Sequence, residues 1–103
     1  MRNQSQLHFN YFEAVIQLRP YDIEVHTLIR KWVEDSGAFI SRELKVRGGV
    51  DIYISSHRVA KKIGKRLKKT FNGTLKVSHT LYGLDNQTSK NLYRATVLFK
   101  KQA

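Results

Sequence analysis

The segment that most constrains the fold of this chain is residues 56–71, SHRVAKKIGKRLKKTF. Its apolar residues recur at intervals of three and four, which is the spacing of one face of an α-helix. The rest of that helix surface is strongly basic, so the helix can bury only a narrow stripe and must pack on a second layer such as a sheet. The stripe consists of Val59, Ala60, Ile63, Leu67 and Phe71, with Gly64 on the same side.

The rest of the chain predicts that second layer. A second helix is expected between the N-cap Asp22 and the stop signal Gly37. The order β-α-β-β-α-β-β predicts one α+β domain, an antiparallel sheet with two helices on one face, of ferredoxin-like or split βαβ type. Runs rich in β-branched and aromatic residues indicate strands at 11–19, 39–46, 50–55, 74–82 and 92–100.

Glycine and polar residues mark the boundaries of these elements. A hairpin turn is expected at Gly48 and Gly49, where glycine supplies a positive φ. Ser55 or Ser56 is expected to cap the helix 56–71. The remaining expectations are a polar loop at 83–91, a flexible N-terminal extension at 1–10 and a single domain at 11–101.

The net charge of +11 is confined to one half of the chain. Residues 1–51 contain seven Lys/Arg and seven Asp/Glu, whereas residues 52–103 contain twelve Lys/Arg and the single acid Asp85. An even excess would indicate solubility alone, but a segregated positive field indicates a polyanionic partner.

The cations of residues 56–71 are spaced in a way that disfavours the free helix. Like charges four residues apart, such as Arg58 and Lys62, destabilise a helix by about 0.2–0.5 kcal/mol per pair at low salt. A solvated surface helix usually mixes signs, so a polyphosphate partner explains the pattern better. Phosphate contacts carry no base specificity, which favours the shape of a folded RNA. The predicted nucleic-acid-binding residues are Arg58, Lys61, Lys62, Lys65, Arg66, Lys68 and Lys69, with Lys76 and Arg94 widening the patch.

Two other classes of function stay open on the same observations. A basic helix also fits an acidic protein surface, which would make the chain a protein-interaction module. A DNA-binding architectural protein would carry a similar charge.

The sheet face away from the helices is a second place where RNA could bind, because aromatic residues on an open sheet stack bases in RNA-recognition motifs. The third strand reads GGVDIYIS, which is not the pattern of that motif, and carboxylates on this face would repel phosphate. A structural role is therefore favoured for the residues of this face: Tyr11, Glu13, Asp51, Tyr53, Lys76, Tyr82 and Arg94.

Nothing in the sequence indicates an enzyme, a cofactor or a metal site. The absence of cysteine excludes a thiol nucleophile and a disulfide framework, and it fits a cytoplasmic location. The four histidines lack metal-ligand spacing, and His79, which alternates with apolar residues, is expected to pack in the core. No apolar run reaches the length of about 18 residues that a membrane span needs, and residues 1–10 do not resemble a signal peptide.

Four motifs resemble the central domain of the Nmd-three family, which comprises the eukaryotic nuclear export adaptor of the large ribosomal subunit and archaeal ribosome-associated relatives. The motifs are YFEAVIQLR, GGVDIYISSHRVAKKIGKRL, LKVSHTLYGLDNQ and YRATVLFK, and together they cover about residues 11–99. The residues that fit the family's patterns are Tyr11, Ala14, Val15, Gln17, Arg19, Gly49, Asp51, Tyr53, Ser56, Lys76, Ser78 and Leu81.

This resemblance implies binding to the large ribosomal subunit during its assembly or export, through ribosomal RNA and ribosomal proteins and without catalysis. Members of the family carry CxxC zinc modules ahead of this domain, and a chain without cysteine has none. The zinc-dependent contacts and the export role are therefore not carried over to this chain.

Overall fold

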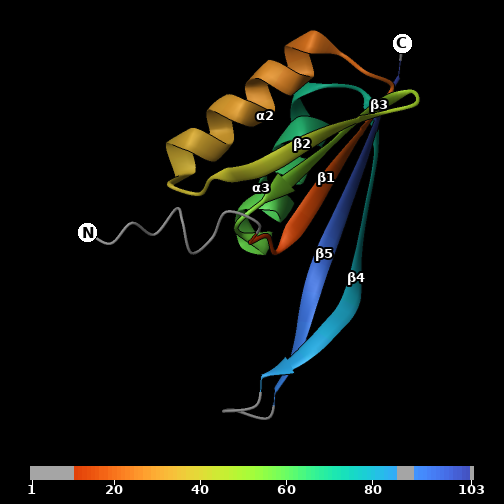
Figure 1. Cartoon of the computed structure of the whole chain (residues 1–103). Helices are drawn as coiled ribbons and strands as arrows, with labels where there is room; N and C mark the ends of the chain where they lie inside the picture. The colour runs from red at the N-terminus through yellow and green to blue at the C-terminus, as the bar shows by residue number, and fades with distance from the viewer. Residues whose placement is uncertain (1–10, 86–89, 103) are drawn as a thin grey trace.

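The computed structural model describes residues 11–85 and 90–102, with the side chains of all of these except 82–85 and 90–92. In this part of the chain, five strands and two helices follow one another in the order that the sequence predicts (Figure 1). The α+β class is therefore confirmed; the expected N-terminal extension lies outside the described residues. The elements are β1 (Ala14–Arg19), α2 (Ile23–Ser36), β2 (Ile40–Val46), β3 (Gly49–Ile54), α3 (His57–Thr70), β4 (Gly73–Asp85) and β5 (Lys90–Lys101).

The strands form one sheet in the order β2-β3-β1-β5-β4. β3 runs antiparallel to β1 and β2, and β4 runs antiparallel to β5, but β1 and β5 are parallel, with Ala14 opposite Ala95. The expectation of an antiparallel sheet is wrong at this pairing, so the sheet is mixed. After α3, β4 runs opposite to β1, and the next hairpin brings β5 back between them in the reverse direction. The split βαβ unit is confirmed, since α2 joins β1 to β2 with β3 between them.

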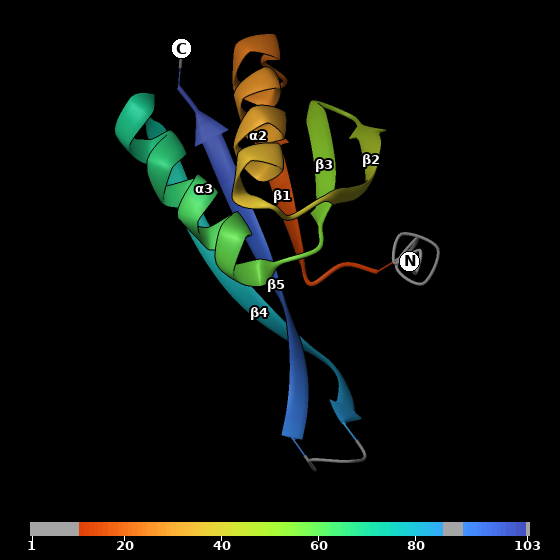
Figure 2. The same ribbon diagram turned by 90° about the vertical axis from the view of Figure 1, so that its left-hand side faces the viewer.

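Both helices pack on one face of the sheet, in front of the strands in Figure 2. Alternate residues of the three central strands point toward the helices and form the core with the helix stripes. The sixteen buried hydrophobic residues are Ala14, Ile16, Leu18, Val25, Ile29, Trp32, Val33, Val50, Ile52, Ile54, Ala60, Ile63, Leu67, Ala95, Val97 and Phe99.

α2 begins and ends where the sequence indicates. The Asp22 carboxylate accepts a hydrogen bond from the backbone N–H of Val25 at 3.0 Å, which satisfies a donor that the first turn leaves free. Gly37 ends the helix in the left-handed region with a φ of 89°, which is the conformation that favours glycine. The turn between β2 and β3 similarly contains Gly48 at a φ of 84°.

β4 and β5 extend further than the sequence predicts. β4 continues to Asp85 and β5 begins at Lys90, so the polar loop expected at 83–91 is shorter, and residues 86–89 lie outside the described part. The two strands stay paired across a register shift between Leu81 and Gly83, and they project as a ribbon beyond the helices (Figure 1). Polar residues do not end strand pairing in such a ribbon, because neither face has to be buried.

α3 approaches the sheet most closely at Gly64. A Cβ atom at this position would lie 2.7 Å from Cγ1 of Val97 and 2.9 Å from Cδ1 of Leu75. Ala60, Ile63 and Leu67 are buried on the same side of the helix. The expected docking stripe is confirmed, and the absence of a side chain at Gly64 lets the helix lie against β4 and β5.

Candidate nucleic-acid interface

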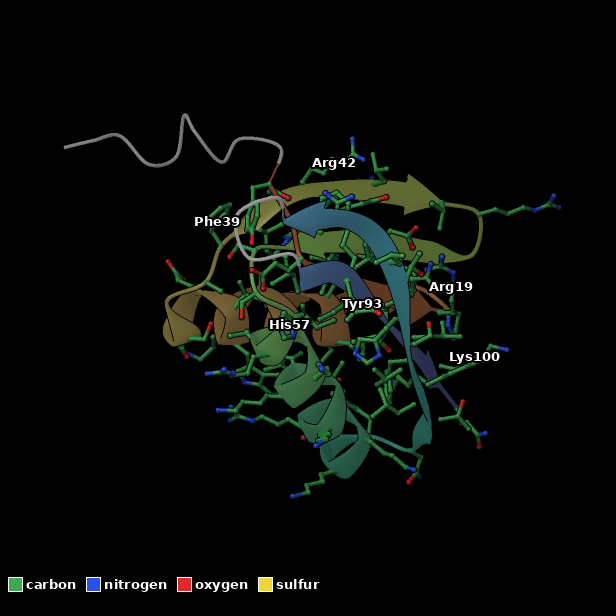
Figure 3. All side chains as sticks on the ribbon, turned by 90° about the horizontal axis from the view of Figure 1, so that it is seen from below. Arg19, Phe39, Arg42, His57, Tyr93 and Lys100 are labelled. Carbon is green, nitrogen blue, oxygen red and sulfur yellow. The ribbon has the colours of Figure 1, made fainter. Side chains whose placement is uncertain are left out.

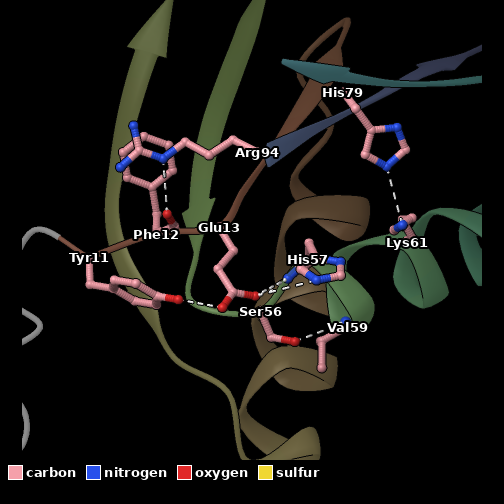
Figure 4. A network of polar contacts seen from close by, with 9 residues as sticks. All are labelled: Tyr11, Phe12, Glu13, Ser56, His57, Val59, Lys61, His79 and Arg94. Carbon is pink, nitrogen blue, oxygen red and sulfur yellow. Dashed lines mark hydrogen bonds and ion pairs between the residues drawn. The ribbon is translucent and has the colours of Figure 1, made fainter. Parts of the chain in front are cut away.

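The start of α3 is held by two caps from different parts of the chain. The Ser56 hydroxyl accepts from the Val59 N–H at 3.3 Å, and the Glu13 carboxylate accepts from the His57 N–H at 3.0 Å (Figure 4). The Tyr11 hydroxyl donates to the other oxygen of the same carboxylate. The first turn of α3 contains no acid, so Glu13 supplies the negative charge that a helix N-terminus favours.

The cations of α3 occupy the half of the helix that faces away from the sheet. An α-helix turns by about 100° per residue, and the buried positions Ala60, Ile63, Gly64 and Leu67 define the opposite side. Four exposed cations spaced by four, three and four residues form an outward row about 16 Å long, given the helical rise of about 1.5 Å per residue. We call this the outward row; it consists of Arg58, Lys62, Lys65 and Lys69.

The two flanks of α3 are attached to neighbouring elements. On the β4 side, Nζ of Lys61 lies 3.2 Å from Nε2 of His79 (Figure 4). On the α2 side, Cζ of Arg66 lies 4.2 Å from the centroid of the Trp32 ring, a cation–π contact. His79 is exposed, so the prediction that it packs in the core is wrong. It shares a face with the apolar residues of β4, but its ring stays exposed beside the Lys61 side chain.

The seven cations of α3 have no carboxylate within ion-pair distance among the side chains that the structure describes. Lys68 and Lys69 lie in the last turn, where positive charge is favourable, whereas Arg58 lies in the first turn, where it is not. Among the described side chains, Glu13 at one end is therefore the one carboxylate that partly neutralises this surface.

α2, in contrast, is neutralised by its surroundings. The Arg30 guanidinium donates to Glu43 at 2.6 and 2.9 Å, and His26 lies 3.1 Å from the same carboxylate. The hydrogen bond from Arg30, aided by His26, lowers the pKa of Glu43 below its usual value. At the N-cap of α2, the hydrogen bond from Lys101 is the main cause of the lowered pKa of Asp22.

Lys76 and Arg94, which the sequence added to the patch, lie on the other face of the sheet. Lys76 is opposite Leu98 and Arg94 is opposite Thr80 in the β4–β5 register, and these positions alternate with the residues that face the helices. The structure therefore brings together the seven cations of α3 and separates Lys76 and Arg94 from them. Lys101 lies on the helix side but is paired with Asp22 at 2.7 Å.

The open face of the sheet has its described aromatic rings already in contact with other side chains. Phe12 and Tyr53 pack edge to face, Arg94 lies over Phe12 at 3.9 Å, and Arg42 lies over Tyr53 at 4.4 Å. Figure 3 shows Arg42 on the side of the sheet away from the helices. The carboxylate of Asp51 is paired with Arg19 at 2.7 Å. These contacts support the structural role expected for Asp51 and Tyr53; the side chain of Tyr82 lies outside the described part.

Sequence reasoning missed three residues that contribute to the helix side of the molecule. Glu13 was assigned to the open face, but it caps α3. His26 was considered only as a metal ligand, but it is buried, with Nδ1 2.9 Å from the Tyr21 hydroxyl. Trp32 belongs to the core and also lies under Arg66, a contact that helical spacing does not reveal. Its tryptophan identity at the edge of an apolar stripe was the one available signal, since tryptophan is a frequent cation–π partner.

The fold and the basic helix define a class of small α+β domain in which one helix presents a row of cations on a mixed sheet. The family model described as NMD3, second domain, matches residues 11–100. The chain therefore belongs to the NMD3 family, as its four motifs indicated. This family is associated with the ribosome and with biogenesis of the large subunit. No curated protein matches the chain.

Neither helix in the described residues is long and apolar enough to cross a membrane. Among the described side chains, no three His, Asp or Glu residues are grouped so that they could hold a metal ion.

Proposed function

We propose that this chain is a non-catalytic RNA-binding module that binds the large ribosomal subunit during its assembly or export; the family's own role as an export adaptor is not part of the proposal. In this proposal α3 contacts phosphates of folded ribosomal RNA, and the partners are that RNA and neighbouring ribosomal proteins on cytoplasmic particles. No membrane, cofactor or small-molecule substrate takes part. The observation that carries the proposal is the outward surface of α3, whose seven cations have no carboxylate partner among the described side chains.

The repulsion between like charges on this surface destabilises the free protein, and this supports an anionic partner. Like charges four residues apart occur at Arg58–Lys62, Lys61–Lys65, Lys62–Arg66 and Lys65–Lys69. Together these pairs destabilise the free helix by about 1–2 kcal/mol at low salt. A row of phosphates would remove this repulsion and would release counterions.

The geometry favours recognition of the phosphate backbone of a folded RNA over recognition of its base sequence. The outward row is straight and about 16 Å long, which suits a phosphate track. Long flexible lysine side chains act on phosphate as point charges, without base specificity. Membership of the NMD3 family, which is associated with large-subunit biogenesis, supports the large ribosomal subunit as the source of that RNA.

Binding of the 103-residue chain to fragments of large-subunit ribosomal RNA, measured at several salt concentrations, tests this proposal. If about six phosphates are contacted, the logarithm of the association constant should fall with the logarithm of salt concentration at a slope of roughly −4 to −5. The variant Arg58→Gln, Lys62→Gln, Lys65→Gln, Lys69→Gln should reduce the slope to about −2 and weaken binding at least about tenfold.

A matched control removes the same charge from exposed cations outside α3: Lys45→Gln, Arg47→Gln, Lys76→Gln and Lys100→Gln. This control should keep a slope close to that of the original chain. Equal losses in the two variants would reject α3 as the contact surface. Duplex DNA and an acidic polypeptide serve as competing ligands, and tighter binding to either one than to the RNA would favour the architectural or protein-interaction alternative.

A further inference from the structure

A groove between the two helices lies beside the outward row. It has a volume of about 330 Å³ and is lined by Trp32, Ser36, Val59, Lys62, Ile63 and Arg66. Its floor is apolar and its rim contains two of the α3 cations. This combination differs from the rest of the α3 surface, where lysine predominates.

Arg66 lies over Trp32 in this groove. Its Cζ lies 4.2 Å from the centroid of the Trp32 ring, and Trp32 is only 8% exposed. Arg66 itself is exposed, so a ligand can reach its guanidinium. None of its side-chain N–H groups donates to an acceptor among the described residues. The side chain therefore presents a flat, pre-positioned cation with its hydrogen-bond donors available.

A planar guanidinium that lies over tryptophan is a suitable surface for an unpaired nucleobase. Unstacked bases in RNA loops and bulges stack on aromatic rings and on arginine planes, and fixing Arg66 on Trp32 reduces the entropy lost on binding. Lys62, on the same rim, belongs to the outward row, which the proposed function assigns to phosphates. A nucleotide whose phosphate lies on that row would have its base within reach of the groove.

We propose that this groove binds a single extruded RNA base, stacked on Arg66 above Trp32. The inference rests on the proposed function and adds to it the kind of RNA recognised: a folded element with a bulged or flipped-out base, in preference to a continuous duplex.

Three RNAs of the same sequence test the proposal: a continuous duplex, the duplex with one bulged nucleotide, and the duplex with one abasic bulged nucleotide. The two bulged RNAs carry the same backbone charge and differ only in the base. Base stacking predicts that the chain binds the base-containing bulge about tenfold more tightly than the abasic bulge. The fluorescence of Trp32, the one tryptophan in the sequence, should change more with the base-containing bulge.

The variant Arg66→Lys keeps the charge but loses the plane. It should reduce the tenfold preference to less than about twofold while leaving the salt slope unchanged, because the number of phosphate contacts is the same. Arg42→Lys is the matched control, since Arg42 also lies over an aromatic ring, Tyr53, but on the opposite face of the sheet. It should keep the full preference.

Equal affinity of the original chain for the two bulged RNAs, with salt-dependent binding to all three, would overturn the base site and leave the proposed function standing. An undiminished preference in Arg66→Lys would also overturn it. If none of the three RNAs binds with a salt dependence, the phosphate-binding role of α3 is rejected, and the base site with it.

Discussion

α2 and α3 are two helices of equal length, 14 residues each, on the same face of the same sheet, and they treat charge in opposite ways. α2 contains acids and bases, and its charged residues form ion pairs such as Arg30–Glu43 and Lys31–Asp35. α3 contains seven bases and no acid. Because both helices dock on this sheet through an apolar stripe, docking alone does not require the basic surface of α3.

The caps of the two helices show a similar contrast. α2 is closed at both ends by its own neighbours in sequence, Asp22 and Gly37. α3 has the local cap Ser56, but the charge at its N-terminus comes from Glu13 in another segment. α3 therefore depends on the assembled sheet for electrostatic support that α2 obtains in part from local residues.

The largest expected effect concerns how α3 docks. Gly64→Val should lower the free energy of unfolding by about 2–3 kcal/mol, because its side chain would overlap Val97 and Leu75. Thr27→Val, at an exposed position within α2, should change it by less than about 0.5 kcal/mol. Urea denaturation measures both, and a small effect at Gly64 would contradict the close packing of α3.

The next effect concerns the charge of the free helices. Replacing Arg58, Lys62, Lys65 and Lys69 by glutamine should raise the free energy of unfolding by about 1–2 kcal/mol at low salt, because every like-charged pair at a spacing of four along α3 is removed.

The corresponding change in α2, Arg30→Gln with Lys31→Gln, should lower the free energy of unfolding by less than about 1 kcal/mol, because ion pairs are lost. Urea denaturation at low and high salt measures both variants, and the stabilisation in α3 should shrink as salt increases. If the free energy of unfolding changed with the same sign in the α2 and α3 variants, the contrast between the two helices would be removed.

The smallest effect is on pH dependence. The hydrogen bond from Arg30 lowers the pKa of Glu43 below its usual 4.5, so the stabilisation is complete above that value and is lost as the pH falls through the folded-state pKa. Between pH 5 and pH 3, the original chain should therefore lose more stability than Glu43→Gln, by less than about 1 kcal/mol. Urea midpoints of both proteins at the two pH values measure this difference. Equal losses of stability in the original chain and in Glu43→Gln would show that Glu43 contributes nothing to acid sensitivity.

Features set by neighbouring residues could be predicted from the sequence. The caps Asp22, Gly37 and Ser56 lie at the helix ends that the sequence indicated, and the stripe of α3 faces the sheet. Such signals depend on residues within one or two turns of each other, so spacing alone reveals them.

Features set by pairing of distant segments could not be predicted. Glu13 and His57 are 44 positions apart, and nothing near either residue indicates that they meet. The position of β5 between β1 and β4 depends on which strand edge is open after α3, and the strand patterns are compatible with either order. The contact between Arg66 and Trp32 arises from the crossing of the two helices, which periodicity does not specify.

The parallel pairing of β1 with β5 has a consequence for how the domain is assembled. The middle of the sheet joins strands from opposite ends of the described chain, with Ala14 beside Ala95. A growing polypeptide therefore cannot complete its centre until the final strand has been synthesised, and such long-range closure is slow compared with local hairpin formation. Loss of that strand would split the sheet into β2-β3-β1 and an isolated β4, and the basic helix would lose a large part of the surface on which it rests.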